Sequence, residues 1–113
     1  MNATQVLKTV GNAYRRTETD MDFVWLRTSI IENQWRRDYK SSSEGIEDVL
    51  WLLVKHGYLQ TRLFTVLETD EWVWEVDRWG NRYLKEKEYT VRKWCLTKKG
   101  IAQLKHWEKL GKF

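Results

Sequence analysis

The sequence contains no proline, one cysteine and two histidines among its 113 residues. A single cysteine, Cys95, excludes an intrachain disulfide framework and a multi-cysteine zinc site. Together with two histidines it does not make a zinc centre, so we expect no bound metal. The longest apolar run, residues 49–54, is far too short to span a bilayer. The first twenty residues lack the pattern of a signal peptide, which predicts a cytoplasmic protein without a membrane segment.

The sequence also has little that predicts catalysis. His56 and His106 lie in two predicted helices that are well separated along the chain. Cys95 lies between apolar residues of a predicted strand, with no base beside it. Gly80 is not part of a glycine-rich phosphate loop. We therefore expect no enzymatic activity, no catalytic residues and no cofactor.

What the sequence does have is eight tryptophans, with 14% aromatic and 32% charged residues. Disordered chains have few aromatics, so this composition predicts a folded domain. The net charge of +4 is unevenly distributed, because residues 1–57 are neutral whereas residues 78–113 hold eleven basic and three acidic side chains. Such asymmetry favours an anionic partner, most commonly nucleic acid. A charged surface that only aids solubility is the alternative interpretation.

Apolar residues recur three and four positions apart in the first half of the chain, which predicts helices at 3–15, 20–38 and 44–56. Asn2 or Thr4 is expected to cap the first helix, Thr19 the second, and Ser42 or Ser43 the third. The buried stripe of the second helix is expected to contain Phe23, Leu26, Ile30 and Ile31. Gly57 then fits the left-handed residue that follows a helix.

Beyond Gly57 the apolar period changes to two, which predicts strands at 58–67, 72–79 and 83–96. Gly80-Asn81 predicts a hairpin turn, and Thr97 is expected to cap a last helix at 98–110. We thus predict one α+β domain over residues 1–113. Its parts are a helical part (1–57), a three-stranded β wing (58–97) and a C-terminal helix (98–110).

Three features between Gly45 and Leu104 follow each other in a familiar order. A helix ends in Lys55-His56-Gly57-Tyr58-Leu59, a hairpin with basic residues comes next, and Trp94-Cys95-Leu96-Thr97-Lys98-Lys99-Gly100 leads into the last helix. This stretch resembles the winged helix-turn-helix family of DNA-binding domains, in particular PadR- and MarR-type regulators. The resemblance implies a third helix in the major groove, a hairpin on the minor groove or phosphates, and a homodimer formed through the terminal helices.

The third helix departs from this pattern, because its outward face carries Glu44, Glu47, Asp48, Trp51 and Lys55. Carboxylates repel phosphates and read bases only in limited cases. We therefore predict a small transcriptional regulator or mobile-element accessory protein that contacts double-stranded DNA mainly through its wing. The candidate nucleic-acid contacts are Arg36, Arg37, Lys40, Ser42, Ser43, Arg78, Arg82, Lys85, Lys87, Arg92 and Lys93.

The alternative function is a winged-helix module for protein–protein contact without DNA affinity, which would use the acidic face of helix 44–56. The tryptophans are compatible with both functions, because most are expected in the core and one or two at an interface. Candidate interface residues, for a homodimer or another partner, are Trp25, Trp51 and Trp107. Trp72, Trp74, Trp79 and Trp94 could stack on bases, and a pocket for a small aromatic ligand between tryptophans is a third possibility.

Overall fold

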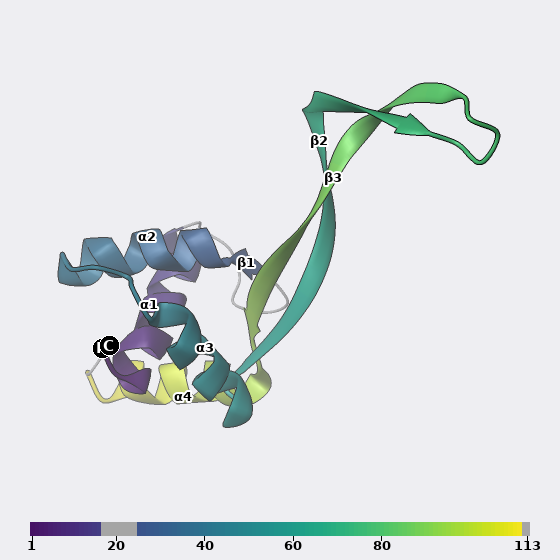
Figure 1. Ribbon diagram of the computed structural model, residues 1–113. Coiled ribbons are helices and arrows are strands. Elements are labelled where there is room, and N and C mark those ends of the chain that lie inside the picture. The colour runs from purple at the N-terminus through teal and green to yellow at the C-terminus, as the bar shows by residue number, and fades with distance from the viewer. Residues whose placement is uncertain (17–24, 112–113) are drawn as a thin grey trace. The chain divides into compact units, whose positions relative to one another are not determined.

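The computed structural model describes residues 1–16 and 25–111, apart from the side chains of residues 68–70 (Figure 1). Within these residues the protein is mixed α+β, which confirms the predicted class. It has four helices and three strands, with the strands in the order β1-β3-β2. The elements are α1 (Ala3–Arg16), β1 (Leu26–Arg27), α2 (Thr28–Tyr39), α3 (Ile46–Lys55), β2 (Leu59–Val76), β3 (Arg82–Leu96) and α4 (Lys98–Lys109).

The first and last helices lie where the sequence predicts them, because their start signals are local. Asn2 accepts a hydrogen bond from the Gln5 amide at 2.9 Å, and the Gln5 side chain accepts one from the Asn2 amide at 3.1 Å. This reciprocal arrangement is a capping box. At α4, Thr97 Oγ1 accepts a hydrogen bond from the Gly100 amide at 3.1 Å. Both caps satisfy amides that have no partner inside the helix.

The second helix is shorter than predicted. The helix α2 begins at Thr28, and Leu26 lies in β1 opposite Trp94 of β3 instead of in a helical stripe. Pairing with a distant strand thus overrides the local helical period at Leu26. Ile30, predicted to be buried, is 37% exposed. The predicted capping residue Thr19 and Phe23 lie outside the described residues.

The start of the third helix also differs from the prediction. The N-cap of α3 is Gly45, which adopts a left-handed conformation with φ of 82° and makes no side-chain capping bond. Ser42 Oγ instead accepts a hydrogen bond from the Glu44 amide, and Ser43 Oγ donates one to Glu32. Neither serine side chain caps α3, because Ser42 bonds an amide of the α2–α3 connection and Ser43 bonds side chains of α2. The end of α3 is as predicted, with Gly57 left-handed at φ of 81°.

The strands differ most from the prediction. Residues 58–67 and 72–79 are not two strands, since β2 runs without interruption from Leu59 to Val76. Residues 69–71 therefore do not break the backbone of the strand. The third strand of the sheet is β1, which is antiparallel to β3. The predicted three-stranded wing is wrong; two long strands form a hairpin, and the third strand comes from the N-terminal part of the chain.

The chain divides into two compact units. Met1–Arg62 together with Lys93–Phe113 form the first, here called the helical unit, and Leu63–Arg92 form the second, here called the hairpin unit. In the helical unit α1 contacts α2, α3 and α4. Its core contains the fully buried side chains of Val6, Leu7, Val10, Tyr14, Ile31, Leu50, Leu59, Trp94 and Leu104.

Tyr14 makes the stability of this core depend on pH. Burial raises the pKa of its hydroxyl well above the ordinary value, and the neighbouring Cys95 adds to the shift. In the unfolded chain tyrosine loses its proton near pH 10, so above that pH the unfolded state binds fewer protons than the folded state and stability falls. We expect Tyr14→Phe to reduce the loss of unfolding free energy between about pH 8 and pH 11, measured by urea unfolding. Equal losses in both proteins would contradict this assignment.

Candidate interaction surface on the hairpin

The hairpin unit is organised by its turn. Asp77 donates its amide to the Asn81 carbonyl at 2.9 Å. The Asp77 carboxylate accepts hydrogen bonds from the amides of Trp79 at 2.9 Å and Asn81 at 2.8 Å. Gly80 adopts the left-handed conformation, with φ of 82°. The predicted Gly80-Asn81 turn is confirmed, and Asp77, which the sequence analysis did not single out, holds it in the manner typical of aspartate.

Side-chain pairs define which residues face each other across the two strands. Lys87 Nζ lies 2.9 Å from the Glu71 carboxylate, and the Tyr83 hydroxyl donates to Glu75 at 3.2 Å. The two pairs share one register, in which Trp74 of β2 lies opposite Leu84 of β3. Because successive side chains of a strand point to opposite faces, the outer part of the hairpin has two distinct faces.

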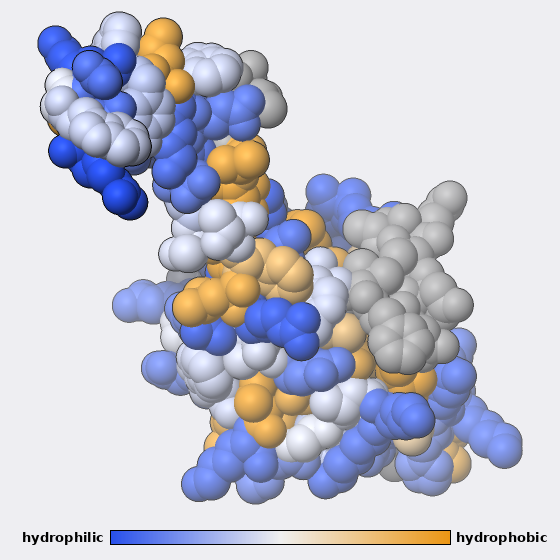
Figure 2. Space-filling view, turned by 90° about the vertical axis from the view of Figure 1, so that its right-hand side faces the viewer, coloured by the Kyte–Doolittle hydropathy of each residue, from blue (hydrophilic) through white to orange (hydrophobic). Residues whose placement is uncertain are grey.

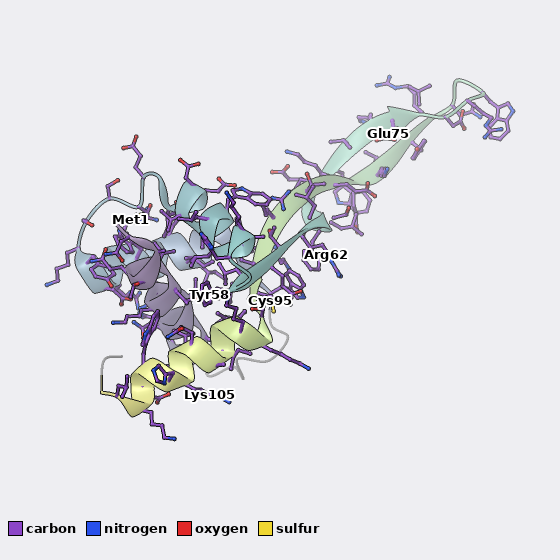
Figure 3. All side chains as sticks on the ribbon, turned by 90° about the horizontal axis from the view of Figure 1, so that it is seen from below. Met1, Tyr58, Arg62, Glu75, Cys95 and Lys105 are labelled. Carbon is purple, nitrogen blue, oxygen red and sulfur yellow. The ribbon has the colours of Figure 1, made fainter. Side chains whose placement is uncertain are left out.

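One face is charged and internally neutralised, and we call it the charged face. Besides the Glu71–Lys87 and Glu75–Tyr83 pairs, Lys85 Nζ lies 3.9 Å from the Glu75 carboxylate on this face. It also lies 3.7 Å from the carboxylate of Glu88, three residues further along β3. The hydrogen bond that the Tyr83 hydroxyl donates to Glu75 raises the pKa of Tyr83. Figure 3 labels Glu75 on the hairpin ribbon. Exposed ion pairs contribute at most about 1 kcal/mol each to the stability of the fold. They nevertheless place a carboxylate beside each of Lys85 and Lys87.

The opposite face is apolar and exposed, and we call it the apolar face. It carries Trp72, Trp74 and Val76 of β2, which are 55%, 61% and 63% exposed, and Leu84 of β3, which is 52% exposed. The Arg82 guanidinium lies 5.3 Å from the centroid of the Trp74 ring, which places Arg82 on the same face. In Figure 2 the hairpin shows pale and orange side chains beside dark blue ones.

The hairpin unit is not the basic surface that the sequence predicts. It contains five basic and seven acidic residues, whereas the rest of the chain contains fifteen basic and nine acidic residues. The predicted excess over residues 78–113 arises from counting β3 together with α4. In the hairpin unit β3 pairs with β2, which contributes acidic residues. The net charge of the hairpin unit is therefore negative instead of positive.

The structure divides the predicted phosphate contacts between the two units. Arg78, Arg82, Lys85, Lys87 and Arg92 belong to the hairpin unit, and the remaining contacts belong to the helical unit. Arg36 and Ser43, two of the predicted contacts in the helical unit, are hydrogen-bonded to each other. Ser43 is only 8% exposed, and its hydroxyl accepts a bond from Arg36 at 3.2 Å. Ser43 therefore does not present its hydroxyl to a ligand.

Three other predicted contacts remain on the surface of the helical unit. Arg37, Lys40 and Ser42 are exposed at the end of α2 and in the connection that follows it. Lys40 holds the left-handed C-cap of α2 at φ of 49°. Lys93, the last predicted contact, is half-buried, and its carbonyl accepts a hydrogen bond from Thr61 at 2.9 Å.

The tryptophans predicted at an interface differ in exposure. Trp51 is 43% exposed on α3. Trp25 is half-buried, with the Arg62 guanidinium 5.2 Å from its ring centroid, and Trp107 is half-buried against the core. Trp94 is fully buried and therefore cannot stack on bases. The tryptophan rings with the greatest exposure are those of Trp72, Trp74 and Trp79, which are among the residues proposed above to stack on bases.

The outward surface of α3 agrees with the sequence analysis. Glu47 and Asp48 in its first turn are exposed, and so are Trp51 and Leu52, each at 43%. Lys55 supplies the basic residue of its last turn. In the position where a reading helix meets DNA, this surface would offer carboxylates and apolar side chains rather than a row of cations.

Other sites are sparse in the described part of the chain. Residues 1–16 and 25–111 contain no cluster of histidine, cysteine or carboxylate side chains able to hold a metal ion, and no helix among them is long and apolar enough to cross a membrane. A cleft of about 280 Å³ is lined by Ala13, Arg16, Ile30, Asn33, Gln34 and Arg37, none of which is a tryptophan. Comparison with protein-family models, curated proteins and solved structures finds no match for this chain.

Proposed function

We propose that the protein is a protein–protein interaction module of the winged-helix type, which binds its partner through the apolar face of the hairpin. The observation that carries this proposal is the exposure of Trp72, Trp74, Val76 and Leu84 side by side on one face of a two-stranded ribbon. A two-stranded hairpin is at best marginally stable in water unless its apolar face is covered. Exposed apolar patches on soluble proteins mark interaction sites, and tryptophan is enriched among the residues that dominate binding energy.

The winged-helix type is supported by the order of the elements. Among the described residues, three helices precede the long hairpin and one helix follows it, as the family resemblance implies. The short strand β1 pairs with β3 and completes a small antiparallel sheet beside the helices of its own unit. The Gly57 turn after α3 and the Thr97 cap of α4 lie at the two motifs on which the resemblance rests.

The charges of the hairpin unit fit a protein partner better than they fit DNA. Binding to DNA gains free energy when cations replace the counterions of the phosphates. In the hairpin unit, Lys85 and Lys87 already lie beside carboxylates, and acidic residues outnumber basic ones. The apolar face offers Arg82 as a cation, yet its guanidinium lies over the Trp74 ring.

A photo-crosslinking experiment tests the proposed function. Benzoylphenylalanine in place of Leu84, on the apolar face, should form adducts with protein when cells that express the chain are irradiated. The matched control carries the same group in place of Val73, which is on the charged face and 37% exposed. We expect protease-sensitive adducts at least several-fold more abundant at position 84 than at position 73. Equal yields, or adducts that only nuclease removes, would contradict the proposal.

Duplex DNA binding is the second candidate function, and the charge of the helical unit favours it. Basic residues outnumber acidic ones there by fifteen to nine, and Arg37 and Lys40 are exposed at the end of α2. This function predicts duplex binding in fluorescence anisotropy that weakens steeply between about 50 and 200 mM salt. Loss of that binding in Arg37→Glu with Lys40→Glu, but not in Arg82→Glu with Lys85→Glu, would replace the proposed function with DNA binding by the helical unit.

A further inference from the structure

We propose that the partner of the apolar face is a second copy of this chain, which docks face to face about a two-fold axis. This inference rests on the proposed function and names its partner. In the dimer, the axis runs between the two hairpins, perpendicular to their strands, at the level of Trp74 and Leu84. The two ribbons then run in opposite directions, with β3 over the partner's β3 and β2 over the partner's β2.

The apolar face is complementary to itself in this arrangement. Alternation along β3 places Arg82, Leu84 and Glu86 on one face. Arg82 and Glu86 lie two residues on either side of Leu84, so the two-fold axis brings Arg82 opposite the partner's Glu86 and Glu86 opposite the partner's Arg82. A two-fold interface requires that one patch fit its own copy, and opposite charges at equal distances from an apolar centre meet this requirement.

The second strand fits the same axis. Trp74 lies opposite Leu84, so the axis also passes beside Trp74 and brings it against the partner's Trp74. Trp72 and Val76 lie two residues on either side of Trp74 on the same face. Trp72 of each copy therefore packs on the partner's Val76, which sets a large side chain against a small one. Layers that combine large and small residues in this way interdigitate well.

The area available is sufficient for a modest dimer. An aromatic side chain buries about 150–250 Å². Trp72 and Trp74 are each more than half exposed, and so are Val76 and Leu84, so the face offers on the order of 500 Å² per copy. The total of roughly 1,000 Å² reaches the lower bound for specific interfaces. We therefore expect a reversible dimer, with a dissociation constant in the micromolar range.

A second copy fits better than a partner with charge of one sign. Such a partner would pair with either Arg82 or Glu86 and leave the other charge against it. Self-docking pairs both charges and also covers the ribbon, because two stacked two-stranded layers supply the shared apolar interior that a single hairpin lacks. The charged face, where Glu71 and Glu75 have basic or hydroxyl partners within the hairpin, remains toward water.

Charge reversal with mixing tests the inference. Sedimentation velocity between about 1 and 100 µM should show a wild-type dimer. Arg82→Glu alone and Glu86→Arg alone should each dimerise at least tenfold more weakly, because each sets like charges against each other at both ends of the interface. An equimolar mixture of the two variants should dimerise again, since every contact then joins one acidic and one basic side chain. Lys85→Glu, on the charged face, is the control that should leave dimerisation unchanged.

The outcomes separate the inference from the proposed function. A wild-type chain that is monomeric at 100 µM, a dimer indifferent to both reversals, or a mixture that fails to recover would overturn self-docking. If protein adducts still form at position 84 in any of these cases, the proposed function stands with a different partner. If no protein adducts form there, the proposed function fails as well. The three substitution sites, Arg82, Lys85 and Glu86, are exposed or half-buried in the hairpin unit, and matching thermal unfolding curves would verify that each variant folds.

Discussion

Replacement of Gly100 by alanine is expected to destabilise the protein by roughly 3–5 kcal/mol, at the upper end of the range for single substitutions. A Cβ atom at this position would lie 2.2 Å from the carbonyl oxygen of Tyr58 and 3.1 Å from a methyl carbon of Leu96. The carbonyl belongs to the backbone and cannot rotate aside as a side chain can. Either α4 or the residues after α3 must move.

Movement there would break several bonds at once. The Tyr58 carbonyl accepts a hydrogen bond from the Thr97 amide at 3.2 Å, and Thr97 Oγ1 is also bonded to the Gly57 carbonyl. The same Oγ1 caps α4 through the Gly100 amide. These hydrogen bonds join the residues after α3 to the start of α4. At position 100 the two segments lie so close together that only glycine, which has no Cβ atom, fits.

Urea unfolding followed by circular dichroism measures this effect. Gly45→Ala is a suitable control, because a Cβ atom at Gly45 has nothing within 4 Å and only the left-handed backbone opposes it. The control should cost about 1–2 kcal/mol. If the two variants lose equal free energy of unfolding, the close approach of α4 to Tyr58 is not important for stability.

Replacement of Trp94 by alanine is expected to cost about 3–5 kcal/mol, which is typical of a large aromatic removed from a core. Trp94 is 0% exposed. Its indole N–H donates to Thr28 Oγ1 at 2.8 Å, and its ring meets the Trp51 ring edge to face at a centroid distance of 5.4 Å. The alanine variant would leave a cavity, remove the donor for Thr28 and remove the ring on which Trp51 packs.

Thermal unfolding distinguishes Trp94 from the exposed tryptophans. Trp79, which is 77% exposed in the hairpin turn, provides a matched control on the same residue type. We expect Trp79→Ala to change the free energy of unfolding by less than about 0.5 kcal/mol. A similar loss in both variants would show that burial does not separate the two classes of tryptophan.

Several helix ends and the hairpin turn were predictable because their signals are local. The Asn2 and Thr97 caps, the left-handed Gly57 and the Gly80-Asn81 turn each depend on a few adjacent residues. The start of α2 was not predictable, because Leu26 lies in β1 and pairs with Trp94 of β3, which is distant in sequence. The continuity of β2 past residues 69–71 likewise depends on the strand beside it and not on the composition of these residues.

The candidate site was only partly predictable for the same reason. Trp72, Trp74 and Val76 occupy alternate positions of the predicted strand 72–79, and the side-chain contacts place them on one face. The predicted contacts Lys85 and Lys87 were correctly found on one strand, but their carboxylate partners are on the other strand. A count along one segment cannot include those partners, so the hairpin unit was predicted to be basic although its net charge is negative.

The sequence alone determined the α+β class, the ends of three helices and the place of the hairpin turn, because propensity, capping and period act over a few residues. Only the tertiary structure decided which tryptophans are buried and which are exposed, and which charges face each other. Burial and ion pairing depend on segments that are far apart in sequence, such as β1 with β3 and β2 with β3. The eight tryptophans therefore predicted a folded chain, whereas strand pairing decided that Trp94 fills the core and that Trp72 and Trp74 form a surface.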